Sequence, residues 1–246
     1  MSKVLFWDVE TTSIDVVVRT YRLRNHIKYF SPDLISRDWS MLGAAWAYGD
    51  GEPVAVSVTA KDPLNDEKVI RKLHEVLGRA EVLVGHNSDG FDLKMFNTRA
   101  AYYGLRPLSQ KVQLDTLKMA RKYFRFSSNK LSYVCQYLGL EMKDNSPDWD
   151  ECLLGNAKEL RYMREYNKQD VVATRDLYHR LKSWHHNHPR VADKLKAIDG
   201  SDVDSCPVCG SADSKKNGTK LMGSGRRKQV IQCLGCGKFR QGGFVS

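Results

Sequence analysis

The order of apolar runs in the first 185 residues constrains the fold more than any other feature of this chain. Short runs typical of buried strands alternate with segments whose apolar residues recur at helical spacing. The predicted strands are 3–7, 41–48, 54–59, 81–84 and 111–115, and the predicted helices are 66–78, 91–103, 117–123, 131–138 and 157–184. Gly49, Asp50 and Gly51, between the second and third strands, are typical of a hairpin turn. This order predicts an α/β fold in which helices flank a mixed sheet.

The length of 246 residues allows one ordinary domain and a small additional module. We expect the first domain over residues 1–185, a polar linker over 186–205 and a small module over 206–246. No apolar run reaches the roughly 18 residues that a membrane span needs, which excludes a transmembrane protein. Asp8 and Glu10 fall where the apolar core of a secretory signal would lie, so we expect a cytoplasmic location and no membrane partner.

The positive charge of the chain is concentrated at its C-terminal end. The net charge is +10, and residues 206–246 contain eight Lys or Arg residues and one acidic residue. Seven of the ten net charges therefore lie in the small module. This asymmetry indicates a polyanionic partner, of which nucleic acid is the usual kind. A lysine-rich surface that serves only solubility is the alternative.

Two carboxylates follow the first predicted strand, at Asp8 and Glu10. Residues two apart on a strand point to the same side of the sheet. Two carboxylates beside apolar neighbours are costly unless a positive charge lies between them, and divalent cations with oxygen ligands are the usual solution. Alone, the pair is also compatible with two exposed acids at the end of a strand.

Two further motifs place polar groups at comparable points of the predicted fold. Asn87, Phe91 and Asp92 come directly after another buried strand. Tyr166 and Asp170 are four residues apart in the long predicted helix, so their side chains share one face. Each motif alone is weak, because Asp92 could cap a helix and a Tyr–Asp pair could be a surface hydrogen bond. Together, on this sheet pattern, they indicate one acidic site.

These motifs resemble the DEDD superfamily of 3′–5′ exonucleases, which have a ribonuclease H-like fold. The first motif matches at Asp8, Glu10 and Thr11, and the third at Tyr166 and Asp170. The second, from Asn87 to Asp92, is most similar to the proofreading domain of family B DNA polymerases. Glu165 stands where the histidine subfamily has its histidine, so the chain resembles the tyrosine subfamily. As a whole it resembles stand-alone exonuclease-like proteins often encoded by phages.

The resemblance implies a two-metal-ion 3′–5′ exonuclease that hydrolyses DNA, single-stranded or at 3′ ends, to nucleoside 5′-monophosphates. Asp8, Glu10 and Asp170 would hold one Mg²⁺ or Mn²⁺, and Asp8 would share a second ion with Asp92. Tyr166 would orient the attacking water, since a tyrosine with a pKa near 10 is a poor base.

Asn87 and Phe91 are expected to contact the nucleic acid and to position it. The alternatives are a 3′–5′ exoribonuclease, since such a metal site does not read the sugar 2′ position, and a non-catalytic nucleic-acid-binding protein on a nuclease fold. The presence of all four acids and of Tyr166 favours a working enzyme.

The small module carries two Cys-x-x-Cys pairs, at Cys206 and Cys209 and at Cys233 and Cys236. Four thiolates at this spacing predict a zinc ribbon in which one Zn²⁺ is structural, because four protein ligands leave no open coordination position. A module of this size needs such a metal to fold.

The ribbon is also basic, with Arg226, Arg227 and Lys228 on its predicted hairpin. We expect these three residues to bind nucleic acid, DNA or else RNA. Contact with a replication or repair protein is the alternative for the ribbon.

Residues 13–40 separate the first strand from the second and give no clear pattern. They mix Arg19, Arg22, Arg24 and Lys28 with the aromatic Tyr21, Tyr29 and Phe30. This mixture fits a surface that stacks bases and holds phosphates. The mixture is equally compatible with basic side chains whose aliphatic parts lie along aromatic residues of the core.

Overall fold

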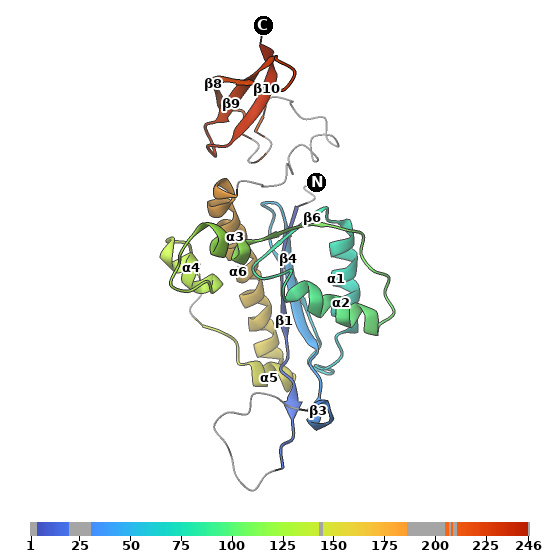
Figure 1. The fold of residues 1–246 in the computed structure, drawn as a ribbon. Coiled ribbons are helices and arrows are strands. Elements are labelled where there is room, and N and C mark those ends of the chain that lie inside the picture. The colour runs from blue at the N-terminus through green and yellow to red at the C-terminus, as the bar shows by residue number, and fades with distance from the viewer. Residues whose placement is uncertain are drawn as a thin grey trace.

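The computed structural model describes residues 4–19, 31–142, 145–185, 205–206, 208 and 211–245. A five-stranded mixed sheet forms the centre of the larger domain, and its strands lie in the order β5-β4-β1-β6-β7 (Figure 1). The strands are β1 (Val4–Thr11), β4 (Met41–Tyr48), β5 (Val54–Ser57), β6 (Val82–Gly85) and β7 (Val112–Asp115). β1 pairs with β4 in the antiparallel and with β6 in the parallel direction. The predicted mixed α/β sheet is confirmed.

Helices cover both faces of this sheet (Figure 1). One face carries α1 (Glu67–Arg79) and α2 (Asp92–Tyr102), and the other carries α3 (Thr116–Tyr123), α4 (Leu131–Tyr137) and the long α6 (Ala157–Leu181). The short α5 (Trp149–Leu153) precedes α6, and two 3-10 helices, η1 (Pro32–Leu34) and η2 (Lys182–Trp184), complete the helical elements of the described residues.

The alternation of side chains along β1 divides them between two cores. Leu5, Trp7 and Val9 pack toward α1 and α2, whereas Phe6 packs toward α6. Asp8 and Glu10 are two and four residues after Phe6 on the same strand, so their side chains also lie on the α6 side of the sheet. The sheet thus presents two carboxylates to the longest helix of the described chain.

A buried ion pair fixes α1 and α2 to the start of β4. The Asp66 side chain is fully buried and accepts hydrogen bonds from Arg99 Nε at 2.7 Å and Nη2 at 2.6 Å. It also accepts from the Tyr103 hydroxyl at 2.6 Å and from the Met41 backbone N–H at 2.9 Å. Burial alone would raise the pKa of Asp66, but these hydrogen bonds lower it below its ordinary value.

The segment between β1 and β4 contributes two short strands that the sequence pattern did not predict. β2 (Asp15–Val16) and β3 (Ile35–Arg37) pair in the antiparallel direction, and Arg37 binds Asp15 at 2.9 Å. Residues 20–30 lie outside the described residues. They include most of the basic and aromatic side chains that could either bind nucleic acid or pack along the core.

The C-terminal module is a three-stranded antiparallel sheet in the order β10-β9-β8. Its strands are β8 (Ser214–Leu221), β9 (Arg227–Cys233) and β10 (Phe239–Val245). Lys238 of this module donates a hydrogen bond to the carbonyl oxygen of His185 at 2.6 Å. Among the described residues, no helix is long and apolar enough to span a membrane.

Candidate functional site

Three carboxylates that are far apart in the sequence meet beside the sheet. Asp8 and Glu10 on β1 and Asp170 on α6 each contribute an oxygen to a cluster in which all three atoms lie within 4.8 Å of one another. All three side chains remain partly exposed. The cluster therefore has the donor type and spacing of a divalent cation site that solvent can reach.

Close packing of α6 on the sheet brings these groups together. Gly43 of β4 lies opposite Glu10, and a Cβ atom at position 43 would come within 2.8 Å of the Met163 Cε atom of α6. The Met163 Cε atom is the end of a flexible side chain, and the Val56 carbonyl oxygen lies 3.0 Å from the same Cβ position. The turn of α6 after Met163 carries Tyr166, and Asp170 follows one turn later. The absence of a side chain at Gly43 thus leaves room for the Met163 side chain of α6 against the sheet, next to the acids.

Tyr166 lies next to the cluster, and its hydroxyl donates a hydrogen bond to the Asp170 carboxylate. The Trp149 ring of α5 packs edge-on against the Tyr166 ring, with centroids 6.1 Å apart. A cavity of about 350 Å³ adjoins this pair and is lined by Glu10, Thr12 and Trp149, among others. Such a volume is within the range of small-ligand sites. The sequence analysis did not identify Trp149, because the five-residue α5 is too short to give a periodic pattern.

Asp92 is the first residue of α2 and is buried. One of its oxygens accepts a hydrogen bond from the backbone N–H of Val9 at 3.1 Å, between the two acids of β1. Its oxygens are not among the three that lie within 4.8 Å of one another. Its charge nonetheless contributes to the raised pKa of Asp8, so the four acids form one electrostatic unit.

Asn167 is a further member of the site that the sequence analysis missed. Its side-chain Nδ2 donates to Asp8 Oδ2 at 2.7 Å, and the residue is 1% exposed. Its Oδ1 is buried without a hydrogen-bond partner among the described residues. A buried amide with one end satisfied by a carboxylate holds that carboxylate in one orientation. The only available signal was its place between Tyr166 and Asp170, which a single sequence does not distinguish from any polar helix residue.

The carboxyl groups of the site have strongly raised pKa values because burial and mutual repulsion both disfavour their ionised forms. Burial and then the charges of Asp92, Glu10 and Asp170 raise the pKa of Asp8 well above its ordinary value. Burial and the charges of Asp170 and Asp92 raise the pKa of Glu10 to about 8. Burial raises the pKa of Asp92 to about 7 and that of Asp170 to about 6. A bound divalent cation would relieve this repulsion, so the residues present fit such an ion.

The loop between β6 and α2 holds the other predicted residues of the second motif. Asn87 has a left-handed backbone with φ of 68°, and its carbonyl accepts from the N–H groups of Gly90 and Phe91. Both Asn87 and Phe91 are exposed at this turn, directly before Asp92. Asp115, at the end of β7, caps α3 and binds the Asn87 N–H at 3.0 Å, so it supports the loop.

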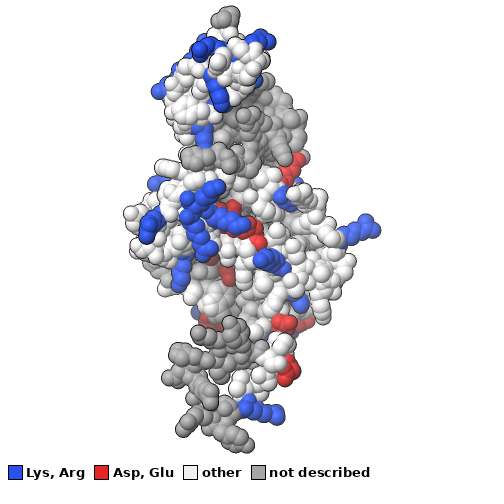
Figure 2. All heavy atoms as spheres, viewed as in Figure 1, with Lys and Arg blue, Asp and Glu red and all other residues white. Residues whose placement is uncertain are grey.

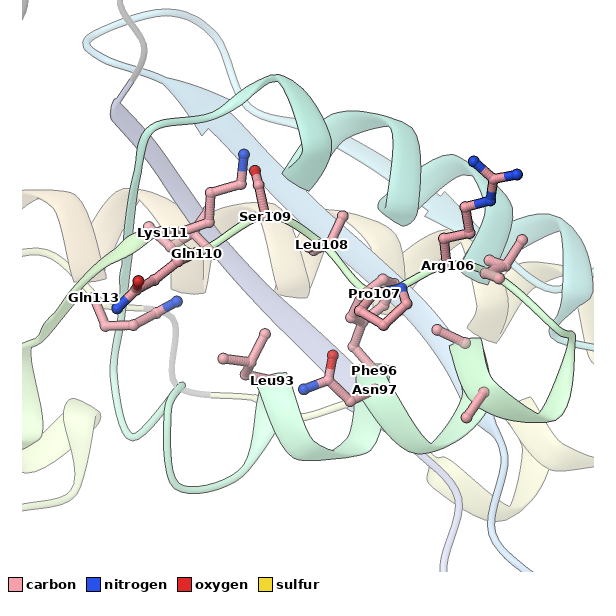
Figure 3. Close-up of a pocket in the computed structure, with 14 residues that line it drawn as sticks. Leu93, Phe96, Asn97, Arg106, Pro107, Leu108, Ser109, Gln110, Lys111 and Gln113 are labelled. Atoms are coloured by element: carbon pink, nitrogen blue, oxygen red, sulfur yellow. The ribbon is translucent and has the colours of Figure 1, made fainter.

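A separate cavity of about 600 Å³ lies between α2 and the segment that leads to β7 (Figure 3). Phe96, Asn97, Leu108 and Lys111 are among its lining residues, and no carboxylate lines it. It is therefore not part of the acidic site.

The cysteines of the C-terminal module also come together. The sulfur atoms of Cys206, Cys233 and Cys236 lie within 4.8 Å of one another, and Cys209 lies outside the described residues. Cys206 Sγ and Cys236 Sγ are 3.6 Å apart, well beyond the roughly 2.05 Å of a disulfide bond. The backbone N–H of Val208 donates to Cys206 Sγ at 3.5 Å. This donor set fits a tetrahedral zinc ion that Cys209 would complete.

The three predicted basic contacts of the module lie at the start of β9. Arg226 is the last residue of the turn before it, and Arg227 and Lys228 are its first two residues. Figure 2 shows Lys and Arg atoms scattered over the visible face of this module and gathered over α3 and α4 of the larger domain.

A known family matches the sequence over residues 36–182, which is more than half of the chain; it is described as the RNase_H superfamily. The chain belongs to this superfamily. The match includes Asp92, Tyr166 and Asp170 but begins after β1, so Asp8 and Glu10 lie outside it. The match and the mixed sheet together establish an RNase H-like fold.

Two named proteins are similar to the chain. A DNA polymerase III PolC-type from Ureaplasma parvum is 24% identical over 123 residues, which are 49% of this chain and 8% of the relative. The family B DNA polymerase structure from Pyrobaculum calidifontis superimposes with a TM-score of 0.56 at 17% identity, over 89% of this chain and 31% of that one. The second similarity concerns the fold alone. The chain spans less than a third of either relative.

Proposed function

We propose that this protein is a metal-dependent 3′–5′ exonuclease that hydrolyses single-stranded DNA to nucleoside 5′-monophosphates. The observation that carries the proposal is the acidic site, where oxygens of Asp8, Glu10 and Asp170 lie within 4.8 Å of one another. Membership of the RNase_H superfamily supports a nuclease, and the motifs resemble those of the DEDD exonucleases. DNA is favoured over RNA because the relative that matches in sequence is a DNA polymerase.

In this proposal the site would hold two divalent cations, Mg²⁺ or Mn²⁺. Asp8, Glu10 and Asp170 would hold one ion, and Asp8 would share the second with Asp92. Such ions stabilise the negative charge that develops on the attacking and leaving oxygens of a phosphodiester.

The other side chains of the site position the reactants in this proposal. Burial first, and then the charges of Asp170, Glu10 and Asp8, raise the pKa of Tyr166 above its ordinary value, so its hydroxyl stays protonated at neutral pH. A protonated hydroxyl can orient the attacking water but cannot remove its proton, which supports the orienting role. Asn167 would hold Asp8 in the orientation that both ions require.

The division into domains at 1–185, 186–205 and 206–246 is part of the proposal. The larger unit would cut the strand. The smaller would be a ribbon whose one structural Zn²⁺ is held by Cys206, Cys209, Cys233 and Cys236, and some of whose basic residues bind the substrate. Contact with a replication or repair protein is the alternative for the ribbon, and the cytoplasmic location stays a prediction.

The test is incubation of 5′-labelled DNA and RNA oligonucleotides with the purified protein and Mg²⁺ or Mn²⁺. We expect a ladder of DNA products that shortens from the 3′ end, and no ladder with Asp8→Ala that retains the circular dichroism spectrum of the wild type. Degradation of RNA without degradation of DNA would make RNA the substrate in place of DNA. Intact substrates in both metals would contradict it.

A further inference from the structure

The strand register of the C-terminal sheet assigns its basic and aromatic side chains to two different faces. Side chains of directly paired residues lie on the same face, and residues two apart on β9 share it. Lys228 of β9 pairs with Lys220 of β8 and with Phe244 of β10. Gln232, four residues further along β9, pairs with Lys215 and Phe239. We call this side the aromatic face; it presents Lys215, Lys220, Lys228, Phe239 and Phe244.

The opposite face has a different composition. Arg227 pairs there with Leu221 and Val245, and Ile231 pairs with Lys216. The Arg227 guanidinium donates a hydrogen bond to the Thr219 hydroxyl at 3.1 Å. The three adjacent basic residues of the sequence are thus divided, because Arg227 points away from the face that Lys228 occupies. The opposite face contains basic and aliphatic side chains but no phenylalanine of the described module.

The two rings of the aromatic face are exposed to solvent. Phe239 is 60% exposed and Phe244 is 49% exposed. The Arg226 guanidinium carbon lies 3.9 Å from the centroid of the Phe244 ring, and the Lys228 ammonium lies 5.0 Å from it. Exposed rings with cations stacked on them contribute little to the core of a small module. They are well suited to bind flat, negatively charged partners.

Charge restricts the kind of partner further. Residues 214–245 contain no Asp or Glu, so every charged side chain of the three strands is positive. Four cations, Lys215, Lys220, Arg226 and Lys228, lie on or next to the aromatic face. The spacing of the rings along the sheet corresponds to four strand residues, or about 13 Å.

We propose that the aromatic face binds single-stranded nucleic acid, with bases stacked on Phe239 and Phe244 and phosphates held by the lysines around them. An unpaired strand exposes the flat faces of its bases, whereas a duplex keeps them stacked inside. That the bound strand is the substrate rests on the proposed nuclease function. The binding of single-stranded nucleic acid to the aromatic face does not. The inference adds which side of the ribbon holds that strand and through which contacts.

The decisive comparison is between two double variants of the full-length protein that remove exposed apolar side chains from opposite faces. One is Phe239→Ala with Phe244→Ala, and its matched control is Leu221→Ala with Val245→Ala. Binding of a fluorescent oligothymidine of about 12 nucleotides is measured by anisotropy, with Ca²⁺ in place of Mg²⁺ to suppress cleavage. Stacking on one aromatic ring changes affinity by about 5- to 100-fold, so the first variant should bind at least 10-fold more weakly than the control.

A second pair of variants removes equal charge from the two faces. Lys215→Gln with Lys220→Gln acts on the aromatic face, and Lys216→Gln with Arg227→Gln acts on the opposite face. Each phosphate contact contributes about 0.7 to the slope of log affinity against log salt on single strands. The first pair should therefore flatten the slope by about 1.4, whereas the second should leave it close to that of the wild type.

Circular dichroism and the melting temperature of each variant must match the wild type before affinities are compared. Equal affinities for the two apolar variants, or equal slopes for the two charge variants, would overturn the inference. If both apolar variants bind the oligonucleotide with wild-type affinity, the role of the ribbon is contact with a protein partner. Cleavage of a short oligonucleotide at saturating concentration reports the nuclease separately: the control variant Leu221→Ala with Val245→Ala should retain it. Face-dependent binding without any cleavage by the wild type would refute the proposed function and leave the inference standing.

Discussion

Replacement of Asp8 by Asn should stabilise the metal-free protein while it abolishes cleavage. The variant keeps the size of the side chain and an oxygen that can accept the hydrogen bond from Asn167. It removes one negative charge from a cluster in which oxygens of Glu10 and Asp170 lie within 4.8 Å. Without a cation, repulsion between the carboxylates of the cluster opposes folding. A neutral side chain at position 8 relieves part of this repulsion.

The magnitude follows from the geometry of the cluster. Two unit charges 4.8 Å apart repel by about 3 kcal/mol at an effective dielectric constant of 20. The groups are partly exposed and take up protons as an alternative to repulsion, so we expect a net gain of about 1–3 kcal/mol at pH 8. One kcal/mol corresponds to about 2–4 °C in a domain of this size. The melting temperature should rise by about 2–12 °C.

The pH dependence gives a second signature with a defined sign. Asp170, Asp92 and Glu10 have folded-state pKa values of about 6, 7 and 8, which are above those of exposed carboxyl groups. A raised carboxyl pKa means that the folded state holds protons more tightly, so the stability of the metal-free wild type is lost as the pH rises from about 5 to 9. The advantage of Asp8→Asn should therefore grow over the same interval.

The assay is thermal unfolding by circular dichroism at several pH values, with and without Mg²⁺. Asp62→Asn, which removes an exposed acid outside the cluster, is the charge-matched control and should shift the melting temperature little. Mg²⁺ at ten times its dissociation constant should stabilise the wild type by about 1.4 kcal/mol and Asp8→Asn by less. A metal-free variant no more stable than the wild type at pH 8, or equal stabilisation of both proteins by Mg²⁺, would refute the electrostatic reasoning.

Three further variants test other parts of the structure. Tyr166→Phe should lower kcat by about 10²–10⁴-fold with little change in KM, measured on a short oligonucleotide; an unchanged kcat would reduce Tyr166 to a packing residue. Asn167→Ala should weaken Mn²⁺ binding measured by calorimetry, because Asp8 loses the group that orients it; retention of wild-type affinity would contradict this role. Arg99→Leu should lower the free energy of unfolding by about 3–5 kcal/mol, because it leaves the buried Asp66 carboxylate without its cation. Urea unfolding measures this loss. A loss below about 1 kcal/mol would show that other groups stabilise the Asp66 charge.

Much of the fold was predictable because it depends on local patterns. The predicted helix 66–78 contains five apolar residues at helical spacing, and these are the buried residues of α1: Val69, Ile70, Leu73, Val76 and Leu77. Two-residue alternation likewise placed both acids of β1 on one side of the sheet, and the structure confirms it. These patterns arise from the backbone geometry of a single element, which the sequence alone contains.

The unpredicted parts depend on tertiary contacts. The hydrogen bond from Asn167 to Asp8 joins residues 159 positions apart, and no local pattern encodes it. β2 and β3 contain only two and three residues, which is too short for an alternation to be recognised. The division of Arg227 and Lys228 between two faces required the strand register of β9, which consecutive basic residues do not reveal.

The hydrogen bond between Asp92 and Val9 has a consequence for any inactive variant made at this site. β6 pairs with β1 only as far as Phe6, and beyond that residue no strand of the described chain neighbours β1 on its β6 side. Asp92 supplies there the acceptor that a neighbouring backbone carbonyl would otherwise provide. Truncation to alanine would therefore remove a backbone partner from the strand that carries Asp8 and Glu10, together with the charge. Asp92→Asn retains an oxygen acceptor, so only this variant separates the loss of a metal ligand from the fraying of a sheet edge.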